Sequence, residues 1–329
     1  MSALAPTLQA FFTDRLARQR HASPATVAAY RDGLKLLITF AAERTATTPS
    51  NLDIADLDAD MVAAFLDHLE RERGNSVTTR NARLAAIRSL FRFAALRHPE
   101  HAATIQRVLA IPSKRCDQKL IDYLTDIEIH ALLAAPDTGT WTGRRDRALL
   151  TLAIQTGLRI SELLGLTIAD LHLGTGAHVN CHGKGRKQRV TPLTRDTIAV
   201  LRSWLEERAG HPDEALFPTR RGTALTRDAV ERRLAVYRTR AAETCPTLNN
   251  KRVTAHVLRH TAAMRLLHAG IDTSVIALWL GHENVDTTQI YLKADMALKE
   301  RALARTAPLK STPGRYTPPD TILAFLEEL

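Results

Sequence analysis

The sequence predicts a mainly α-helical fold with one small β-hairpin, on two observations. Apolar residues recur every three or four positions through most of the 329 residues, which is the spacing of one helix face. Strand-like patterns are confined to residues 177–182 and 188–192, which flank the turn Gly183-Lys184-Gly185. Apolar residues make up 45% of the chain, as in globular proteins, and the length suffices for two domains with separate cores.

Residues 1–111 are predicted to form a helical domain. Ser23 and Pro24 open its first clear helix, because proline fits the first turn, and two further helices are predicted over residues 61–69 and 76–96. The apolar positions that define the three helix faces are Val27, Tyr30, Leu34, Leu37 and Ile38, then Val62, Phe65, Leu66 and Leu69, and then Leu84, Ile87, Leu90, Phe91 and Ala94.

The helix predicted over residues 76–96 has a basic side. Arginines that follow one helix face can track the phosphates of a nucleic-acid backbone, and a solvated helix face is the alternative. The arginines on this side are Arg80, Arg83, Arg88 and Arg92, of which the first three are candidates for DNA contact.

Residues 112–120 are predicted to be a linker, because a proline and a basic cluster interrupt the helical pattern there. A second domain is expected over residues 121–306. Thr125 and Glu128 form a capping box at the start of its first helix. Its remaining helices are predicted over residues 145–156, 196–208, 227–240, 256–269, 272–280 and 295–305.

The composition indicates the kind of partner and the cellular location to expect. A net charge of +10 and a pI near 9.9 favour a polyanionic partner such as nucleic acid. There is no apolar run of the ~20 residues that a membrane span needs, and no secretory signal at the start. Cys116, Cys181 and Cys245 lie far apart without CxxC spacing, so the expected location is a reducing cytoplasm. His178, Cys181 and His182 lack a second ligand pair, so no metal site is predicted.

Six polar residues in the second domain have the side chains that phosphodiester cleavage without a metal requires. That reaction needs a nucleophile, cations around the phosphate oxygens, and an acid for the departing oxygen. Arginine suits the second task because its planar fork binds two phosphate oxygens at once. The six residues are Arg159, Lys184, His256, Arg259, His282 and Tyr291.

The first two of these residues lie in turns. Arg159 follows a glycine turn, and Glu162 three residues later can orient it through a salt bridge. Lys184 lies at the hairpin tip, where a flexible ammonium can give a proton to a leaving alkoxide. A solvated basic turn is the alternative for Lys184, and the neighbouring Arg186 and Lys187 are candidates for DNA contact.

The other four belong to the last predicted helices. His256 and Arg259 share a helix face at i, i+3 spacing and can meet one phosphate, whereas His260 is expected to be a supporting residue. His282 follows a helix-ending glycine and can donate a hydrogen bond to phosphate. Tyr291 can form a phosphotyrosyl ester that keeps the bond energy, so that the strand can be resealed without ATP.

In the segments TGLRISEL, GKGRKQR, HVLRH, GH and TTQIY, these residues resemble the ordered motif set of the tyrosine recombinase, or phage integrase, family. The chain looks like the Xer-like and mobile-element-associated members of that family. The resemblance covers roughly residues 120–305 and implies a tyrosine recombinase catalytic domain there. The N-terminal helices are similar in kind to the family's SAM-like core-binding domain.

The resemblance implies a mechanism without metal, cofactor or ATP. Tyr291 attacks the scissile phosphate and leaves a 3′-phosphotyrosyl link with a free 5′-hydroxyl. Lys184 protonates the 5′-oxygen, and His256 assists proton transfer from the tyrosine. The residues implied to hold the phosphate are Arg159, Arg259 and His282.

The resemblance also implies partners. They are double-stranded DNA with inverted-repeat-like sites and further copies of the chain, in a tetramer with half of its sites active at once. Whether partner recombinases join it, and whether the outcome is integration, excision, transposition or dimer resolution, stays open. A nucleoid-associated cytoplasmic location is expected, and Arg227 and Arg232 are further candidates for DNA contact.

Two other functions share part of this pattern. A recombinase-derived accessory protein would bind DNA without cutting it, but the six residues are all present, which argues against it. A type IB topoisomerase would share the chemistry and relax supercoils without pairing sites. The short chain and the Xer-like hairpin argue against that reading.

Residues 307–329 are expected to be a tail. A proline-rich break over residues 308–319 precedes a short acidic helix. Docking on a neighbouring protomer and packing on its own subunit are both open for this helix. Its apolar face is formed by Ile322, Phe325, Leu326 and Leu329.

Overall fold

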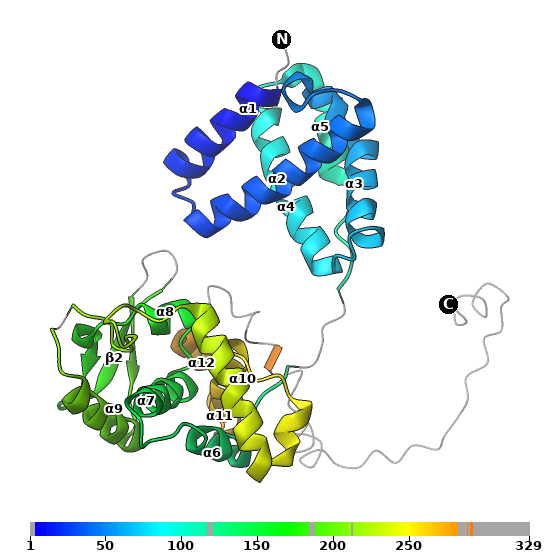
Figure 1. The fold of residues 1–329 in the computed structure, drawn as a ribbon. Helices are drawn as coiled ribbons and strands as arrows, with labels where there is room; N and C mark the ends of the chain where they lie inside the picture. The colour runs from blue at the N-terminus through cyan, green and yellow to red at the C-terminus, as the bar shows by residue number, and fades with distance from the viewer. Residues whose placement is uncertain are drawn as a thin grey trace, which may run out of the picture. The chain divides into compact units, whose positions relative to one another are not determined.

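The computed structural model confirms a mainly helical chain with a small antiparallel sheet (Figure 1). The chain divides into two compact units, Met1–Gln118 and Lys119–Leu329. The residues that the structure describes are 4–116, 121–183, 188–211, 213–281, 288, 290 and 291.

All regular secondary structure in the described residues of the first unit is helical. The three predicted helices are confirmed, and Ser23 caps the first of them by accepting a hydrogen bond from the Thr26 backbone N–H. Most of the predicted apolar positions, among them Leu37, Phe65 and Ile87, are buried in its core, and Val27, Tyr30 and Ile38 are partly buried against it. Its longer elements are α1 (Leu4–Ala10), the π-helical η1 (Phe11–Gln19), α2 (Pro24–Thr45), α3 (Ala59–Arg71), α4 (Val77–Ala95) and α5 (Ala102–Ala110), and its 3₁₀ turns are η2 (Pro49–Asn51), η3 (Ile54–Leu57) and η4 (Pro99–His101).

The basic side of α4 holds the backbone that follows α5. Arg80 is only 6% exposed, and its Nη1 donates to the Pro112 carbonyl at 3.2 Å. Arg88 donates to the Ile111 carbonyl, and Arg83 donates to a carbonyl of α2. The expectation of an open arginine face is therefore corrected for these residues, because their guanidinium groups satisfy backbone oxygens. Of the four arginines on this side, Arg92 alone is exposed.

The second unit begins with the predicted capping box. Thr125 N–H donates to Glu128 Oε2 at 2.8 Å, and Glu128 N–H donates back to the threonine hydroxyl. The helix predicted over residues 145–156 begins earlier, because the Thr140 hydroxyl caps it. The helical elements are α6 (Asp126–Ala134), α7 (Trp141–Thr156), α8 (Ile160–Leu164), α9 (Arg195–Arg208), α10 (Arg227–Thr244), α11 (Ala255–His268) and α12 (Thr273–Leu280), with short 3₁₀ turns at η5 (Ile168–Asp170) and η7 (Pro246–Asn250).

The sheet of the second unit has three antiparallel strands in the order β1-β2-β3. The predicted hairpin is confirmed as β2 (His178–His182) and β3 (Gln188–Pro192), in a register that pairs Cys181 with Arg189. The third strand, β1 (Leu171–His172), was not predicted, since two residues are too few to show an alternating pattern.

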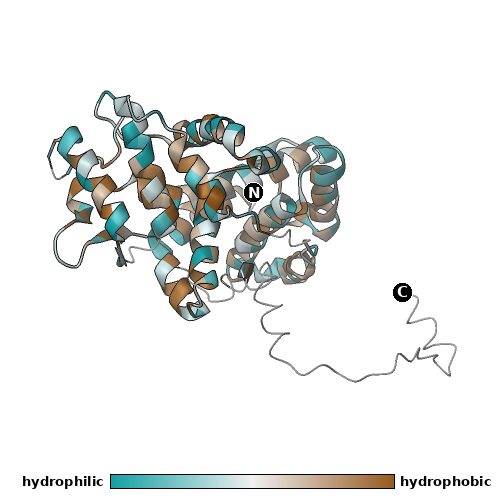
Figure 2. Ribbon diagram, turned by 90° about the horizontal axis from the view of Figure 1, so that it is seen from below, coloured by the Kyte–Doolittle hydropathy of each residue, from teal (hydrophilic) through white to brown (hydrophobic). Residues whose placement is uncertain are grey.

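Helix α7 lies in the core of the second unit and packs against α9 and α11. Apolar residues, brown in Figure 2, gather where helices face one another. None of the described helices combines the length and apolarity required to cross a bilayer. The helix predicted over residues 295–305 and the tail over residues 307–329 lie outside the described residues.

Candidate active site

Arg259 is anchored by the ends of two helices. It lies on α11, is 5% exposed, and its Nη1 and Nη2 donate to the carbonyls of Gly157 at 2.7 Å and Leu280 at 2.9 Å. These carbonyls lie at the C-terminal ends of α7 and α12, where helix dipoles place partial negative charge. Burial, together with the nearby Arg159, lowers the pKa of Arg259 to about 10, so the guanidinium remains charged at neutral pH.

Gly157 permits this close approach. Its φ of +65° is a left-handed conformation that ends α7, and a Cβ there would lie 2.6 Å from Leu280 Cδ2. A larger residue would therefore meet the side chains of Leu280 and Ala262, and the positive φ would add backbone strain at the carbonyl that holds Arg259.

Arg159 lies at the start of α8, and its side chain is only partly buried. Its backbone N–H and Nη1 each donate to Glu162 at 2.8 Å, and its Nη2 donates to the Gly281 carbonyl at 2.9 Å. The Arg159 side chain is 36% exposed, so part of its guanidinium remains open to an anion from solvent. Glu162 orients Arg159 as predicted.

Glu162 is ionised at this site. Burial raises its pKa, but hydrogen bonds from Arg189 and Arg159 outweigh burial and lower the pKa to about 2. A buried carboxylate thus balances part of the charge of the surrounding arginines and fixes their positions.

Tyr291 lies in the same unit beside two histidines. It is 1% exposed, and its hydroxyl lies 3.1 Å from Nδ1 of His260. The His260 ring in turn contacts the His256 ring, with centroids 4.1 Å apart. Burial raises the pKa of Tyr291, while the charges of Arg259 and Arg159 oppose that rise. The structure therefore brings Tyr291 within the field of both arginines and gives it His260 as a direct partner.

His256 lies in the first turn of α11 and is exposed. Partial desolvation, with the nearby cations Arg259 and Arg227, lowers its pKa. His256 is therefore mainly neutral at pH 7 and able to accept a proton.

Lys184, Arg186, Lys187 and His282 lie outside the described residues. Two residues that lie near them in the sequence, and that the structure describes, nevertheless contact residues of the site. Gly281, directly before His282, accepts a hydrogen bond from Arg159, and Arg189, soon after the Lys184 turn, binds Glu162.

Sequence reasoning missed Arg189 as a part of this site. Its Nη1 and Nη2 donate to the two oxygens of Glu162 at 3.1 and 2.7 Å. The only available signal was its position in the GKGRKQR segment, which does not reveal that the side chain points toward α8.

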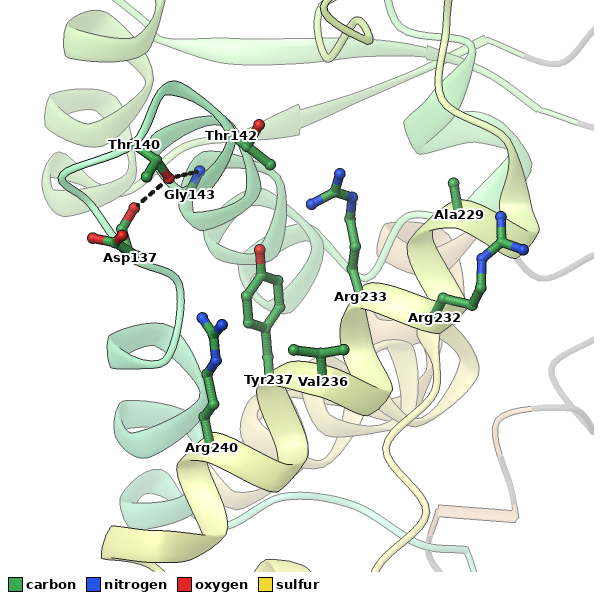
Figure 3. Close-up of a pocket in the computed structure, with 10 residues that line it drawn as sticks. All are labelled: Asp137, Thr140, Thr142, Gly143, Ala229, Arg232, Arg233, Val236, Tyr237 and Arg240. Carbon is green, nitrogen blue, oxygen red and sulfur yellow. Dashed lines mark hydrogen bonds between the residues drawn. The ribbon is translucent and has the colours of Figure 1, made fainter.

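The two DNA-contact candidates on α10 lie in different surroundings. Arg227 is exposed at the start of the helix, close enough to influence the pKa of His256. Arg232 lines a hollow of about 480 Å³ with Arg233 and Arg240 (Figure 3), and none of the predicted catalytic residues lines that hollow. In it, Arg233 Nη1 donates to the buried Asp146 at 2.7 Å.

Groups of three or more His, Cys, Asp or Glu side chains that could hold a metal are absent from the part of the chain that the structure describes. The cationic groups that the described site offers to an anion are Arg159 and Arg259, which are held by carbonyls and by Glu162.

Comparison with known proteins identifies the family of the chain. Residues 122–297 match the family model described as "Phage integrase family", and residues 10–98 match "Phage integrase, N-terminal SAM-like domain". The integrase/recombinase y4rC of Sinorhizobium fredii is 53% identical over 328 residues, which are 100% of this chain and 99% of that protein. Tyrosine recombinase XerD of Yersinia pestis is 32% identical and aligns with 85% of this chain and 90% of its own length.

Solved structures share the fold. XerH recombinase bound to palindromic difH substrate, in a post-cleavage complex, has a TM-score of 0.65 and 24% identity, covering 87% of this chain and 81% of that one. The Tn1549 transposon integrase in complex with transposon right-end DNA has a TM-score of 0.66 and 16% identity, covering 90% and 99%. From its motifs, its fold and these relatives, the chain is a member of the phage integrase, or tyrosine recombinase, family.

Proposed function

We propose that this protein is a site-specific DNA recombinase that cuts and rejoins strands through a 3′-phosphotyrosyl intermediate on Tyr291. The observation that carries the proposal is the placement of Tyr291 in the field of Arg159 and Arg259, which are anchored at the ends of α7 and α12. Two fixed guanidinium groups can neutralise the charge that builds on phosphate oxygens during displacement.

The reaction balances with residues of this chain. Tyr291 Oη bonds to phosphorus as the bond from phosphorus to the 5′-oxygen breaks. After the phenol oxygen leaves His260, the tyrosine proton passes to the neutral His256, whose ring lies beside that of His260. Lys184 gives a proton to the departing 5′-oxygen, and His282 helps to hold the phosphate. Reversal of the step by a new 5′-hydroxyl reseals the strand without ATP.

Tyr291 is buried, and its hydroxyl contacts His260. Attack on a phosphate requires the phenol oxygen to leave this partner and face the two arginines. His260 therefore holds Tyr291 in a resting position, and DNA binding displaces the Tyr291 hydroxyl from His260.

The partner is duplex DNA with inverted-repeat-like sites, and the protein acts as a tetramer at synapsis, with or without partner recombinases. XerH is bound to a palindromic difH substrate and the Tn1549 integrase to transposon right end DNA, which supports a DNA partner for this chain. In this arrangement residues 1–111 bind DNA, residues 112–120 link the domains and residues 121–306 catalyse. A cytoplasmic, nucleoid-associated location follows from the substrate.

The tail over residues 307–329 acts in assembly by docking on a neighbouring protomer. Its predicted acidic helix with one apolar face supports this role. Deletion of residues 319–329 should lower tetramer formation on DNA, measured by mass photometry, while single-site binding persists. Unchanged assembly would place the helix on its own subunit.

The test uses labelled, nicked DNA from the flanks of the gene, with the wild-type protein and Tyr291→Phe. Wild type should form an SDS-resistant adduct, and Tyr291→Phe should bind equally well and form none. No wild-type adduct despite tight binding would favour an accessory DNA-binding protein. Relaxation of plasmids regardless of sequence would favour a topoisomerase.

A further inference from the structure

Arg189 connects the β-hairpin to Arg159 through the carboxylate of Glu162. It lies on β3, two residues beyond residues 184–187, which are outside the described part of the chain. Its side chain is 13% exposed, and its two terminal nitrogens bind the two oxygens of Glu162. Glu162 binds Arg159 with the same two oxygens. One buried carboxylate therefore joins β3 to the start of α8.

A second contact joins Arg189 to the end of α12. A Cβ added at Gly281 would lie 2.8 Å from Arg189 Nη1, so the guanidinium packs directly against this glycine's backbone. The Gly281 carbonyl accepts a hydrogen bond from Arg159 Nη2 at 2.9 Å. Glu162 and the Gly281 carbonyl are thus two partners that hold the Arg159 guanidinium, and Arg189 contacts both residues.

The chemistry of this contact requires arginine. A planar fork can bind both carboxylate oxygens while it packs flat against a backbone, whereas lysine offers a single point of charge. Without the fork, Glu162 loses two of its donors and can rotate, and Arg159 then loses a fixed position.

We propose that Arg189 is a positioning residue that fixes Arg159 against the scissile phosphate through Glu162 and Gly281. It thereby ties the strand after the Lys184 turn to the phosphate site. This inference rests on the proposed function.

The experiment compares Arg189→Gln with wild type in single-turnover cleavage of three substrates. The substrates are an ordinary phosphodiester, a methylphosphonate that lacks the negative charge at the scissile position, and a 5′-phosphorothiolate whose leaving group needs no acid. A misplaced Arg159 should slow cleavage of the phosphodiester roughly 100-fold. The reduction in cleavage rate should be at least severalfold smaller on the methylphosphonate, because its scissile group carries less negative charge for Arg159 to neutralise. On the 5′-phosphorothiolate the reduction in rate should persist.

Two further variants keep the test independent of folding. Arg189→Lys retains the charge without the fork and should show the same substrate pattern with a smaller loss. Arg195→Gln, at the exposed first residue of α9, is the matched control and should cleave all three substrates like wild type. Thermal unfolding of each variant shows whether it is folded.

Gly281→Ala tests the second contact from the other side. The added methyl group should push the Arg189 guanidinium away and slow cleavage of the phosphodiester. As with Arg189→Gln, the reduction in rate should be smaller on the methylphosphonate. Gly270→Ala is its control, because Gly270 also has a positive φ of +81° but nothing within 4 Å of an added Cβ.

Three results with Arg189→Gln would overturn the positioning role of Arg189. Wild-type cleavage by Arg189→Gln, or an equal loss on the phosphodiester and the methylphosphonate, would overturn it. Rescue by the 5′-phosphorothiolate would also overturn it, by placing the effect on the acid Lys184. Failure of the proposed function would look different, because the wild-type protein would then form no adduct with the ordinary phosphodiester.

Discussion

The arginines of α4 and the arginines of the candidate active site use the same contact, a guanidinium bound to backbone carbonyl oxygens. In the first unit, Arg80 and Arg88 bind carbonyls of the chain after α5. In the second unit, Arg159 and Arg259 bind carbonyls at the ends of α7 and α12. The contact alone therefore does not distinguish a structural arginine from a catalytic one.

The surroundings of the guanidinium groups differ between α4 and the candidate active site. Arg80 is enclosed, with the acid Glu70 nearby, and holds one segment of chain in place. Arg159 is also tied to an acid, Glu162, but remains 36% exposed and lies in the field that acts on Tyr291. Arg259 is as enclosed as Arg80, yet its charge, like that of Arg159, acts on Tyr291. Proximity to the nucleophile, rather than exposure, therefore distinguishes the arginines of the active site.

The largest effect is expected from Arg259→Ala. Loss of a buried cation that faces the nucleophile should lower the rate of adduct formation by roughly 1,000-fold. The removed side chain also leaves the Gly157 and Leu280 carbonyls without these donors. Single-turnover cleavage measures the loss, and a reduction below tenfold would mean that anchoring, not catalysis, is the main task of Arg259.

A pH-dependent effect is expected at Glu162. Its pKa is about 2 in the folded chain against an ordinary 4.5, so the ionised form stabilises the fold above pH 4.5. This stability, about 3 kcal/mol, is lost as the pH falls from 4.5 toward 2. Urea unfolding from pH 6 to pH 3 should show a falling stability for wild type and a flatter profile for Glu162→Gln. Equal slopes for the two proteins would contradict the assignment.

Arg80→Ala should affect stability rather than DNA binding. Removal of its hydrogen bond to the Pro112 carbonyl should lower the free energy of unfolding by about 1–2 kcal/mol. The salt dependence of DNA affinity should stay unchanged, since no phosphate contact is lost. Arg92→Ala, at the exposed position of the same helix, is the control and should leave stability intact. A smaller salt slope for Arg80→Ala would restore it as a phosphate contact.

The smallest effect is expected from Arg227→Ala. Loss of one phosphate contact should reduce the slope of log affinity against log salt by about one. Removal of this cation should also raise the pKa of His256 toward its ordinary value, because Arg227 now lowers it. Fluorescence anisotropy at several salt concentrations and NMR titration of the histidine measure the two effects. An unchanged slope would mean that Arg227 makes no phosphate contact.

Local rules were enough to predict most of the longer elements. The capping box at Thr125 and Glu128, the helices α2, α3 and α4 and the hairpin follow from signals within a few residues, whereas α1, η1, α5, α8 and β1 were not predicted. The ordered motif set also named Arg159, Arg259 and Tyr291, and in the structure the charges of both arginines act on the tyrosine.

The rest depends on tertiary packing that local patterns do not encode. Arg80 looked like a free helix-face cation, yet the chain after α5 folds back over it. Arg189 was not identified from the sequence, because its partner Glu162 lies 27 positions away in the chain and only the fold brings the two within hydrogen-bonding distance. His260 was expected to be a supporting residue, and its contact with the Tyr291 hydroxyl could not be inferred from helix periodicity.

The central claim is that Tyr291 forms the covalent bond to DNA. The most direct measurement is mass spectrometry of the protein–DNA adduct after digestion by nuclease and protease, to identify the residue that carries the nucleotide. The account predicts a 3′-phosphonucleotide on the peptide that contains Tyr291. A nucleotide on any other residue, with Tyr316 as the nearest alternative tyrosine in the sequence, would contradict it.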